Sequence, residues 1–250
     1  MKKRYIVTFV LVALGILGPY VWYAHASIYW KLGADSLNAP ADYGTFALGE
    51  QSTHAGPITY IAIGDSLTAG VGVDSYTQSY PYLIASSLAM ARHAQVRLEP
   101  FAVPGVRTQY VIDNFLDPVV KEKPDIVTLL IGINDIHGKV PDAVFTEHYE
   151  TILKRLTGET EAEIYAINLP YIGTPVLIDP VFREYFQWRT AHYNAIIQAL
   201  AAKYGVKYID LYSAHQPHEL DNTYYASDHF HPNAEGYTLW ARAIYAGFNN

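Results

Sequence analysis

The stretch ITYIAIGDSLTAG, residues 58–70, is an apolar run that ends at a glycine and continues into a short polar loop. Its first six residues are mostly β-branched or aromatic, as in a strand that is covered on both faces. Asp65 and Ser66 lie side by side directly after this run. Ser66 is therefore either the N-cap of the next helix or a nucleophile at the end of a strand.

Similar apolar runs recur along the chain and alternate with longer amphipathic stretches. Four more predicted strands cover residues 96–102, 126–131, 163–169 and 206–211, and helices are expected near 80–93, 107–121, 141–157, 183–204 and 234–247. This alternation is typical of a parallel sheet with helices on both faces. Right-handed crossovers place all the loops that follow the strands at one end of the sheet, where such folds bind ligands. We predict one α/β domain over 57–250, a three-layer α/β/α sandwich with a five-stranded parallel sheet.

The first 26 residues have the pattern of a targeting segment. Lys2, Lys3 and Arg4 precede an uncharged, apolar run that continues to about Tyr23. Two interpretations remain open: a signal peptide cleaved after the AHA triplet at 24–26, or an uncleaved membrane anchor. Either one predicts an extracytoplasmic protein, secreted or anchored, whose membrane contact is made by this segment. Residues 27–56, rich in alanine, glycine and serine, are expected to form a spacer.

Composition excludes several classes of function. The formal net charge of −7 and the lack of a long basic run argue against a nucleic-acid partner, because such binding depends on lysine and arginine. The chain contains no cysteine, which excludes disulfides, thiolate metal sites and cysteine nucleophiles. Histidines gather in one late segment (His215, His218, His229 and His231) but lack the HExxH spacing, so we predict no metal site.

Residue types that carry chemistry follow the predicted strands. These segments are GDS (64–66), VPGVRT (103–108), GIND (132–135) and SDHFHPN (227–233). Acyl transfer requires a hydroxyl nucleophile, a base, a group that orients the base, and donors for the oxyanion. A candidate of each kind lies at the same predicted end of the sheet.

Three of these segments resemble the conserved blocks of the SGNH hydrolases, also called GDSL-type esterases and lipases. GDSLTAG, GIND and SDHFHPNAEGY carry the resemblance, which extends over residues 58–248. It implies a flavodoxin-like SGNH hydrolase fold with Ser66 as nucleophile, His231 as base and Asp228 as the partner of the base. It also implies an oxyanion hole formed by the backbone N–H groups of Ser66 and Gly105 and by the side-chain amide of Asn134.

Two further expectations follow from this interpretation. Asp65 is expected to hold the Ser66 loop, and removal of Asn134 is expected to slow the reaction while leaving folding nearly unchanged. The segment YIGTPVLIDPVFREYFQW, 171–188, is longer than a usual connection and is apolar. We expect four of its residues either to form an acyl pocket or flap, or merely to extend the core: Ile172, Val176, Leu177 and Phe182.

The function predicted from these residues is hydrolysis of an acyl ester through a Ser66 acyl-enzyme, with no metal or organic cofactor. The substrate class stays open between small-molecule, lipid and glycan esters. A carbohydrate O-acetyl esterase and an acyltransferase acting on cell-envelope glycans are the alternatives. A glycan-binding module without catalysis is a further alternative, which the full set of reactive residues disfavours.

Overall fold

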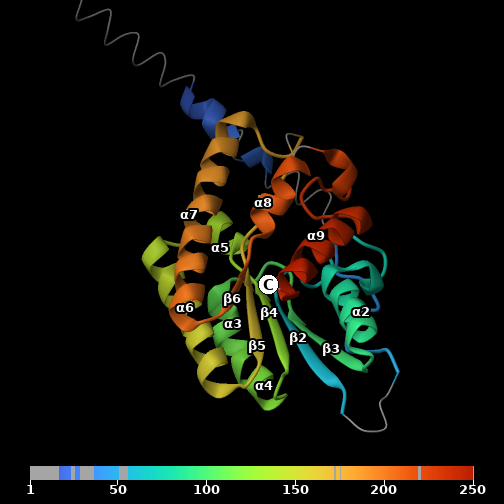
Figure 1. The fold of residues 1–250 in the computed structure, drawn as a ribbon. Helices are drawn as coiled ribbons and strands as arrows, with labels where there is room; N and C mark the ends of the chain where they lie inside the picture. Colours follow the sequence, from blue (N-terminus) through green and yellow to red (C-terminus); the bar gives the residue numbers. More distant parts are fainter. Residues whose placement is uncertain are drawn as a thin grey trace, which may run out of the picture.

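A computed structural model describes residues 17–23, 26–28, 37–50, 56–171, 173–174, 176–218 and 221–249. Its centre is a six-stranded sheet in the order β1-β3-β2-β4-β5-β6 (Figure 1). The strands are β1 (Phe46–Leu48), β2 (Ile58–Gly64), β3 (Val96–Ala102), β4 (Ile126–Leu130), β5 (Glu163–Ile167) and β6 (Lys207–Ile209). Strands β2 to β6 pair in parallel, which confirms the predicted α/β class.

The sixth strand corrects the predicted count of five. β1 pairs antiparallel with β3, with Phe46 opposite Leu98, and lies in the segment expected to be a spacer. The Phe46 ring stacks on Tyr76, with ring centroids 5.6 Å apart, and meets the edge of Tyr82. Part of the expected spacer is therefore built into the domain.

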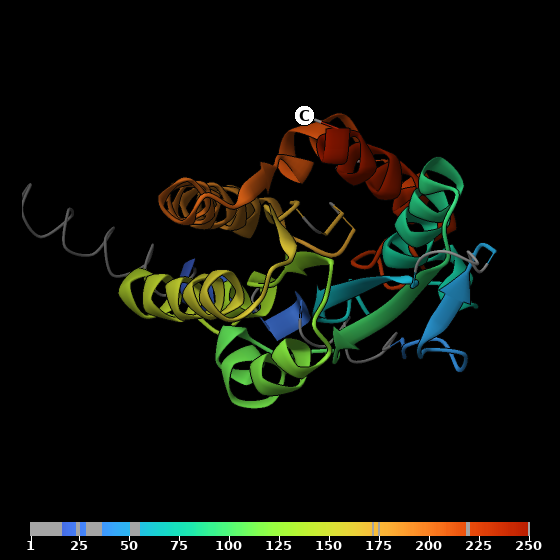
Figure 2. The same cartoon turned by 60° about the horizontal axis from the view of Figure 1, so that its bottom comes forward.

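Helices cover both faces of the sheet. α2 (Tyr80–Arg92) packs against α9 (Ala234–Ala246) on one face (Figure 2). The other face carries α3 (Thr108–Asn114), α4 (Leu116–Lys121), α6 (Asp142–Glu159) and α7 (Pro180–Tyr204). The short helices are α5 (Ile133–His137), α8 (Leu211–His215), η1 (Tyr76–Gln78), η2 (Gln216–His218), η3 (Asn222–Tyr224) and η4 (Gly247–Asn249).

The two central strands position the loops that matter most. β4 is buried along its whole length and β2 beyond its first residue, because helices cover both faces. β2 ends at Gly64, where a Cβ atom would lie 1.9 Å from Thr68 Oγ1 and 2.6 Å from the Leu130 carbonyl oxygen. Only glycine therefore fits this close approach to Thr68 and to β4, and the next two residues follow it at the carboxyl end of the sheet.

The N-terminal prediction falls largely outside the described residues. Of the expected targeting segment, 17–23 and 26 are described and are helical. Over the described ranges, no helix is both long enough and apolar enough to cross a membrane.

Candidate active site

Ser66, His231 and Asp228 form a hydrogen-bonded chain at the carboxyl end of the sheet. His231 Nε2 lies 2.9 Å from Ser66 Oγ, and His231 Nδ1 lies 2.5 Å from Asp228 Oδ2. A carboxylate can only accept, so Nδ1 carries a proton and the neutral ring leaves Nε2 free to accept the serine hydroxyl proton. This tautomer is the one that a general base requires.

The loop before α9 fixes the carboxylate and the imidazole relative to each other. Asp228 Oδ1 accepts the backbone N–H groups of Phe230 and His231, both at 3.0 Å. Asn233 then caps α9 by accepting the N–H groups of Glu235 and Gly236. Burial works against the charge of Asp228, but the hydrogen bonds from His231 and from the loop backbone outweigh it and lower its pKa. Asp228 therefore stays ionised beside the imidazole.

Asn134 lies in α5, directly after its first residue Ile133, and lines the same cavity as Ser66. Its Nδ2 donates to Asp65 Oδ2 at 3.1 Å and to the Val106 carbonyl oxygen at 3.0 Å. Gly105 precedes Val106 and has φ +81°, a left-handed conformation that favours glycine. Both amide hydrogens of Asn134 are thus engaged, one of them by the loop that carries Gly105.

Two buried carboxyl groups support this arrangement. Asp65 Oδ1 accepts the Leu67 N–H at 3.0 Å, and burial, aided by the nearby charge of Asp135, raises the pKa of Asp65 to about 7. Asp135 accepts both the hydroxyl and the backbone N–H of Thr108, at 2.6 and 3.1 Å. Burial raises the pKa of Asp135 as well. Asp65 therefore contacts the Ser66 loop, the role expected for it, and also accepts from Asn134, which was not expected. The role of Thr108 gave no signal in the sequence.

A cavity of about 240 Å³ opens beside Ser66, and we call it the Ser66 cavity. Polar groups on its wall come from Ser66, Gly105, Asn134, Asp228 and His231, and the remaining lining residues are Leu37, Val71, Pro104, His137 and Phe230. Burial lowers the pKa of His137 to about 4, so this ring is neutral at pH 7 and adds no charge. The cavity thus places an apolar surface next to the hydroxyl group.

The three predicted pocket residues that the structure describes lie outside the Ser66 cavity. Ile172 falls outside the described residues, and none of Val176, Leu177 and Phe182 lines the Ser66 cavity. Leu177 is 2% exposed within the core, Phe182 packs against that core, and Val176 is 48% exposed. Leu177 and Phe182 therefore fit the alternative in which the segment extends the core, and exposed Val176 belongs neither to the core nor to the Ser66 cavity. The segment does meet the site through its backbone, because the Thr174 N–H donates to the His229 carbonyl oxygen at 3.0 Å.

His215, one of the four clustered histidines, has a structural environment. His215 is buried, accepts from Trp240 Nε1 at Nδ1 and lies 3.0 Å from the Tyr225 hydroxyl through Nε2. Burial lowers the pKa of His215 to about 4. In the part of the chain that the structure describes, no three histidine or carboxylate side chains are grouped so that they could hold a metal ion.

Comparisons with known proteins identify the family of the chain. The family model described as "GDSL-like Lipase/Acylhydrolase family" matches residues 62–239. The chain is 24% identical over 209 residues to the spore germination lipase LipC of Bacillus licheniformis, covering 76% of this chain and 95% of that protein. It is also 24% identical over 173 residues to an acetylxylan esterase of Geobacillus stearothermophilus, covering 65% and 77% of the two chains.

Solved structures show the same fold. A lipase/acylhydrolase from Enterococcus faecalis superimposes with a TM-score of 0.62 at 24% identity, covering 76% of this chain and 94% of that one. TesA gives a TM-score of 0.62 at 17% identity, with coverage of 76% and 97%. The family model spans most of the chain, and the fold agrees with it. The chain therefore belongs to the GDSL-like lipase/acylhydrolase family and is a serine ester hydrolase.

Proposed function

We propose that Ser66, His231 and Asp228 are the catalytic triad of this hydrolase. As Ser66 Oγ attacks the ester carbonyl carbon, His231 Nε2 takes the hydroxyl proton and Asp228 stabilises the resulting imidazolium. The imidazolium then protonates the leaving alkoxide, which leaves Ser66 acylated. Water, deprotonated by the same imidazole, releases the acid and restores the serine. The observation that carries this proposal is the continuous chain of contacts, 2.9 Å and 2.5 Å, from serine to carboxylate.

The oxyanion would be held by the backbone N–H groups of Ser66 and Gly105 and by Asn134 Nδ2. In the unliganded arrangement the Val106 carbonyl oxygen accepts one Asn134 hydrogen. We propose that the substrate oxyanion takes the place of this carbonyl oxygen. The exchange favours the transition state because a charged acceptor makes a stronger hydrogen bond than a neutral carbonyl.

The dimensions of the Ser66 cavity favour a short acyl group. Its 240 Å³ is below the range of about 300–1,000 Å³ that is usual for sites enclosing drug-sized ligands. A short or medium-length acyl chain fits beside the apolar lining, whereas a long fatty acyl chain would extend beyond it. The same observation favours a carbohydrate O-acetyl esterase as the second candidate function, and one relative is named as an acetylxylan esterase.

Product analysis with and without a sugar acceptor distinguishes both of these hydrolases, the short-chain esterase and the O-acetyl esterase, from an acyltransferase.

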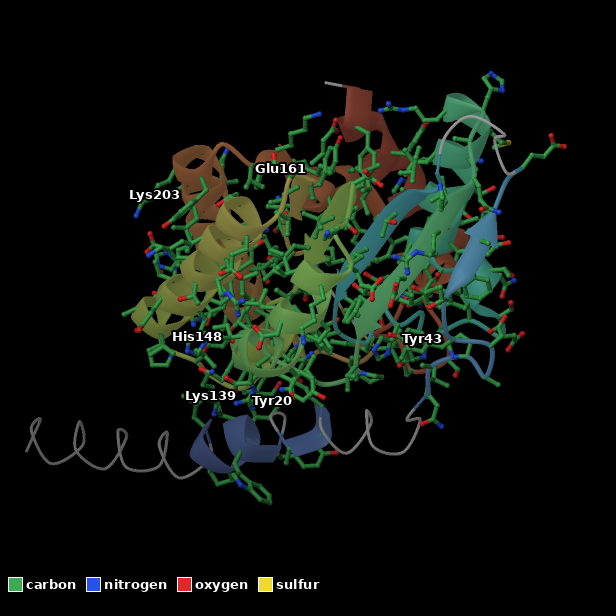
Figure 3. The ribbon with its side chains drawn as sticks, turned by 90° about the horizontal axis from the view of Figure 1, so that it is seen from below. Tyr20, Tyr43, Lys139, His148, Glu161 and Lys203 are labelled. Carbon is green, nitrogen blue, oxygen red and sulfur yellow. The ribbon has the colours of Figure 1, made fainter. Side chains whose placement is uncertain are left out.

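We further propose that the protein acts outside the cytoplasm. The proposal is supported by the three basic residues at 2–4 and the apolar run that follows them. In the described helical segment 17–23, Trp22 and Tyr23 are 72% and 67% exposed, and the Tyr20 hydroxyl donates to Asp179 (Figure 3). Cell fractionation, with the mass of the recovered chain, tests export and reports whether the first 26 residues are removed. Recovery from the cytoplasm alone would contradict this proposal.

A fluorophosphonate probe tests the assignment of the nucleophile. The wild-type chain should be labelled and should hydrolyse 4-nitrophenyl acetate, and Ser66→Ala should abolish both. Ser87→Ala is a matched control, since the Ser87 hydroxyl donates to the Leu83 carbonyl oxygen within α2, away from the cavity. Labelling that persists in Ser66→Ala would refute the proposed nucleophile.

A further inference from the structure

Residues 37–48, which we call the N-terminal strap, run from the Ser66 cavity to the edge of the sheet. They precede the region matched by the family model, which begins at residue 62. The strap ends in β1, where Leu48 pairs with Val96 of β3. Its beginning, Leu37, lines the cavity that holds Ser66 and His231. One short segment outside the matched region thus joins the sheet to the active site.

Side-chain hydrogen bonds fasten the middle of the strap to the domain. Asp42 Oδ2 accepts the Ser75 hydroxyl at 2.6 Å, and Asp42 Oδ1 accepts the Tyr76 N–H at 2.7 Å. The Tyr43 ring meets the Tyr76 ring edge to face, with centroids 5.3 Å apart. The path that leads from β1 to Leu37 is therefore fixed at residues 42 and 43.

Tyr43 also contacts the strand that leads to Gly105. Its hydroxyl lies 2.8 Å from the Ala102 carbonyl oxygen and accepts the Ala102 N–H at 3.1 Å (Figure 3). Ala102 is the last residue of β3, and Gly105 follows three residues later. The Tyr43 hydroxyl thus contacts both backbone polar groups of Ala102, the residue at which β3 ends and the loop to Gly105 begins.

We propose that the N-terminal strap determines the acyl specificity of this enzyme. Leu37 forms the wall that limits the Ser66 cavity to short acyl groups, and Tyr43 is a positioning residue for the loop that carries Gly105. The inference rests on the proposed function, because it takes the Ser66 cavity as the site of the acyl group. It extends that function by placing specificity in residues that lie upstream of the matched region.

Shortening Leu37 should lengthen the preferred acyl chain. Burial of one additional methylene group strengthens binding about fourfold when apolar space is available for it. Leu37→Ala should therefore raise the ratio of kcat/KM for a hexanoyl ester to that for a butyryl ester by about tenfold. Leu37→Trp should act in the opposite direction and leave the acetyl ester as the best substrate.

The experiment measures kcat/KM of the full chain on 4-nitrophenyl acetate, butyrate, hexanoate and octanoate. Active sites are counted with the fluorophosphonate probe, with Ser66→Ala beside the wild type. A failed nucleophile assignment is then seen as labelling that is absent from the wild type or persists in Ser66→Ala, and not as an altered profile. Leu239→Ala, on α9 and outside the Ser66 cavity, is the matched control and should keep the wild-type profile. The proposal is overturned if both Leu37 variants are labelled normally and keep the wild-type profile.

Tyr43→Phe tests the positioning role separately. Loss of the hydroxyl should lower kcat about tenfold for every ester while KM and the order of preference stay unchanged, because the loop and not the acyl wall is affected. Tyr82→Phe is the matched control, since Tyr82 also packs against the strap through Phe46. A kcat for Tyr43→Phe equal to that of the control would remove Tyr43 from the proposal.

Discussion

Asn134→Ala should damage both catalysis and stability, and the structure gives the size of each effect. Loss of one oxyanion donor costs about 2.7–4 kcal/mol of transition-state stabilisation, or about 10²–10³ in kcat. The same amide donates to Asp65 Oδ2, in a residue that is 1% exposed, and to the Val106 carbonyl oxygen. Buried acceptors that lose their donor cost about 1–3 kcal/mol of the free energy of unfolding. The expectation from sequence that folding would be nearly unaffected is therefore revised.

The two effects are measured on the same preparations. Saturating 4-nitrophenyl butyrate gives kcat, and urea unfolding gives the free energy of unfolding. Asn114→Ala is the matched control, because its exposed amide donates to the Tyr110 carbonyl oxygen within α3 and should change either quantity little. A variant with kcat within threefold of wild type would refute the oxyanion role. Unchanged stability would refute the reasoning about Asp65 and Val106.

Two further substitutions test the charges around the site. Asp228→Asn should lower kcat by on the order of 10⁴ with a small change in KM, because an amide cannot stabilise the imidazolium. Steady-state kinetics measure both constants. A loss of kcat below tenfold would contradict the assignment of Asp228. The raised pKa of Asp65, about 7, means that the folded state keeps a proton that the unfolded state releases above about pH 4. This contribution to stability falls as pH rises from about 4 to 7, so the unfolding free energy of Asp65→Asn should increase more steeply with pH than that of wild type. Urea unfolding at pH 5 and 7 measures the difference, and identical slopes would show that Asp65 is ionised throughout.

The central strands and the loops that follow them could be predicted from the sequence, because they depend on the pattern of apolar residues within short segments. The runs at 58–63 and 126–131 are apolar because both faces of β2 and β4 are covered, and the loops that follow them must meet at one end of a parallel sheet. The helix expected over 107–121 instead divides into α3 and α4 at Phe115. Pro118 explains the break, since it cannot donate to the Asn114 carbonyl and its ring crowds that group.

What the sequence did not indicate depends on contacts between distant segments. β1 has three residues and no repeated pattern, and it exists through its pairing with β3 and the stacking of Phe46 on Tyr76. Leu37 lies in a stretch without periodicity, so nothing marked it as a wall of the cavity. The hydrogen bond from Asn134 to the Val106 carbonyl oxygen joins two loops through space, which no motif encodes.

The pairing of β1 with β3 also bears on how the molecule avoids self-association. β3 has seven residues and β2 on one side, so without β1 its other side would offer a long row of unpaired backbone N–H and C=O groups. With β1 in place, both outermost strands of the sheet, β1 and β6, have three residues each. Short outer strands are poor templates for strand addition by a second chain. Detachment of β1 would thus expose this side of β3 and favour aggregation through it.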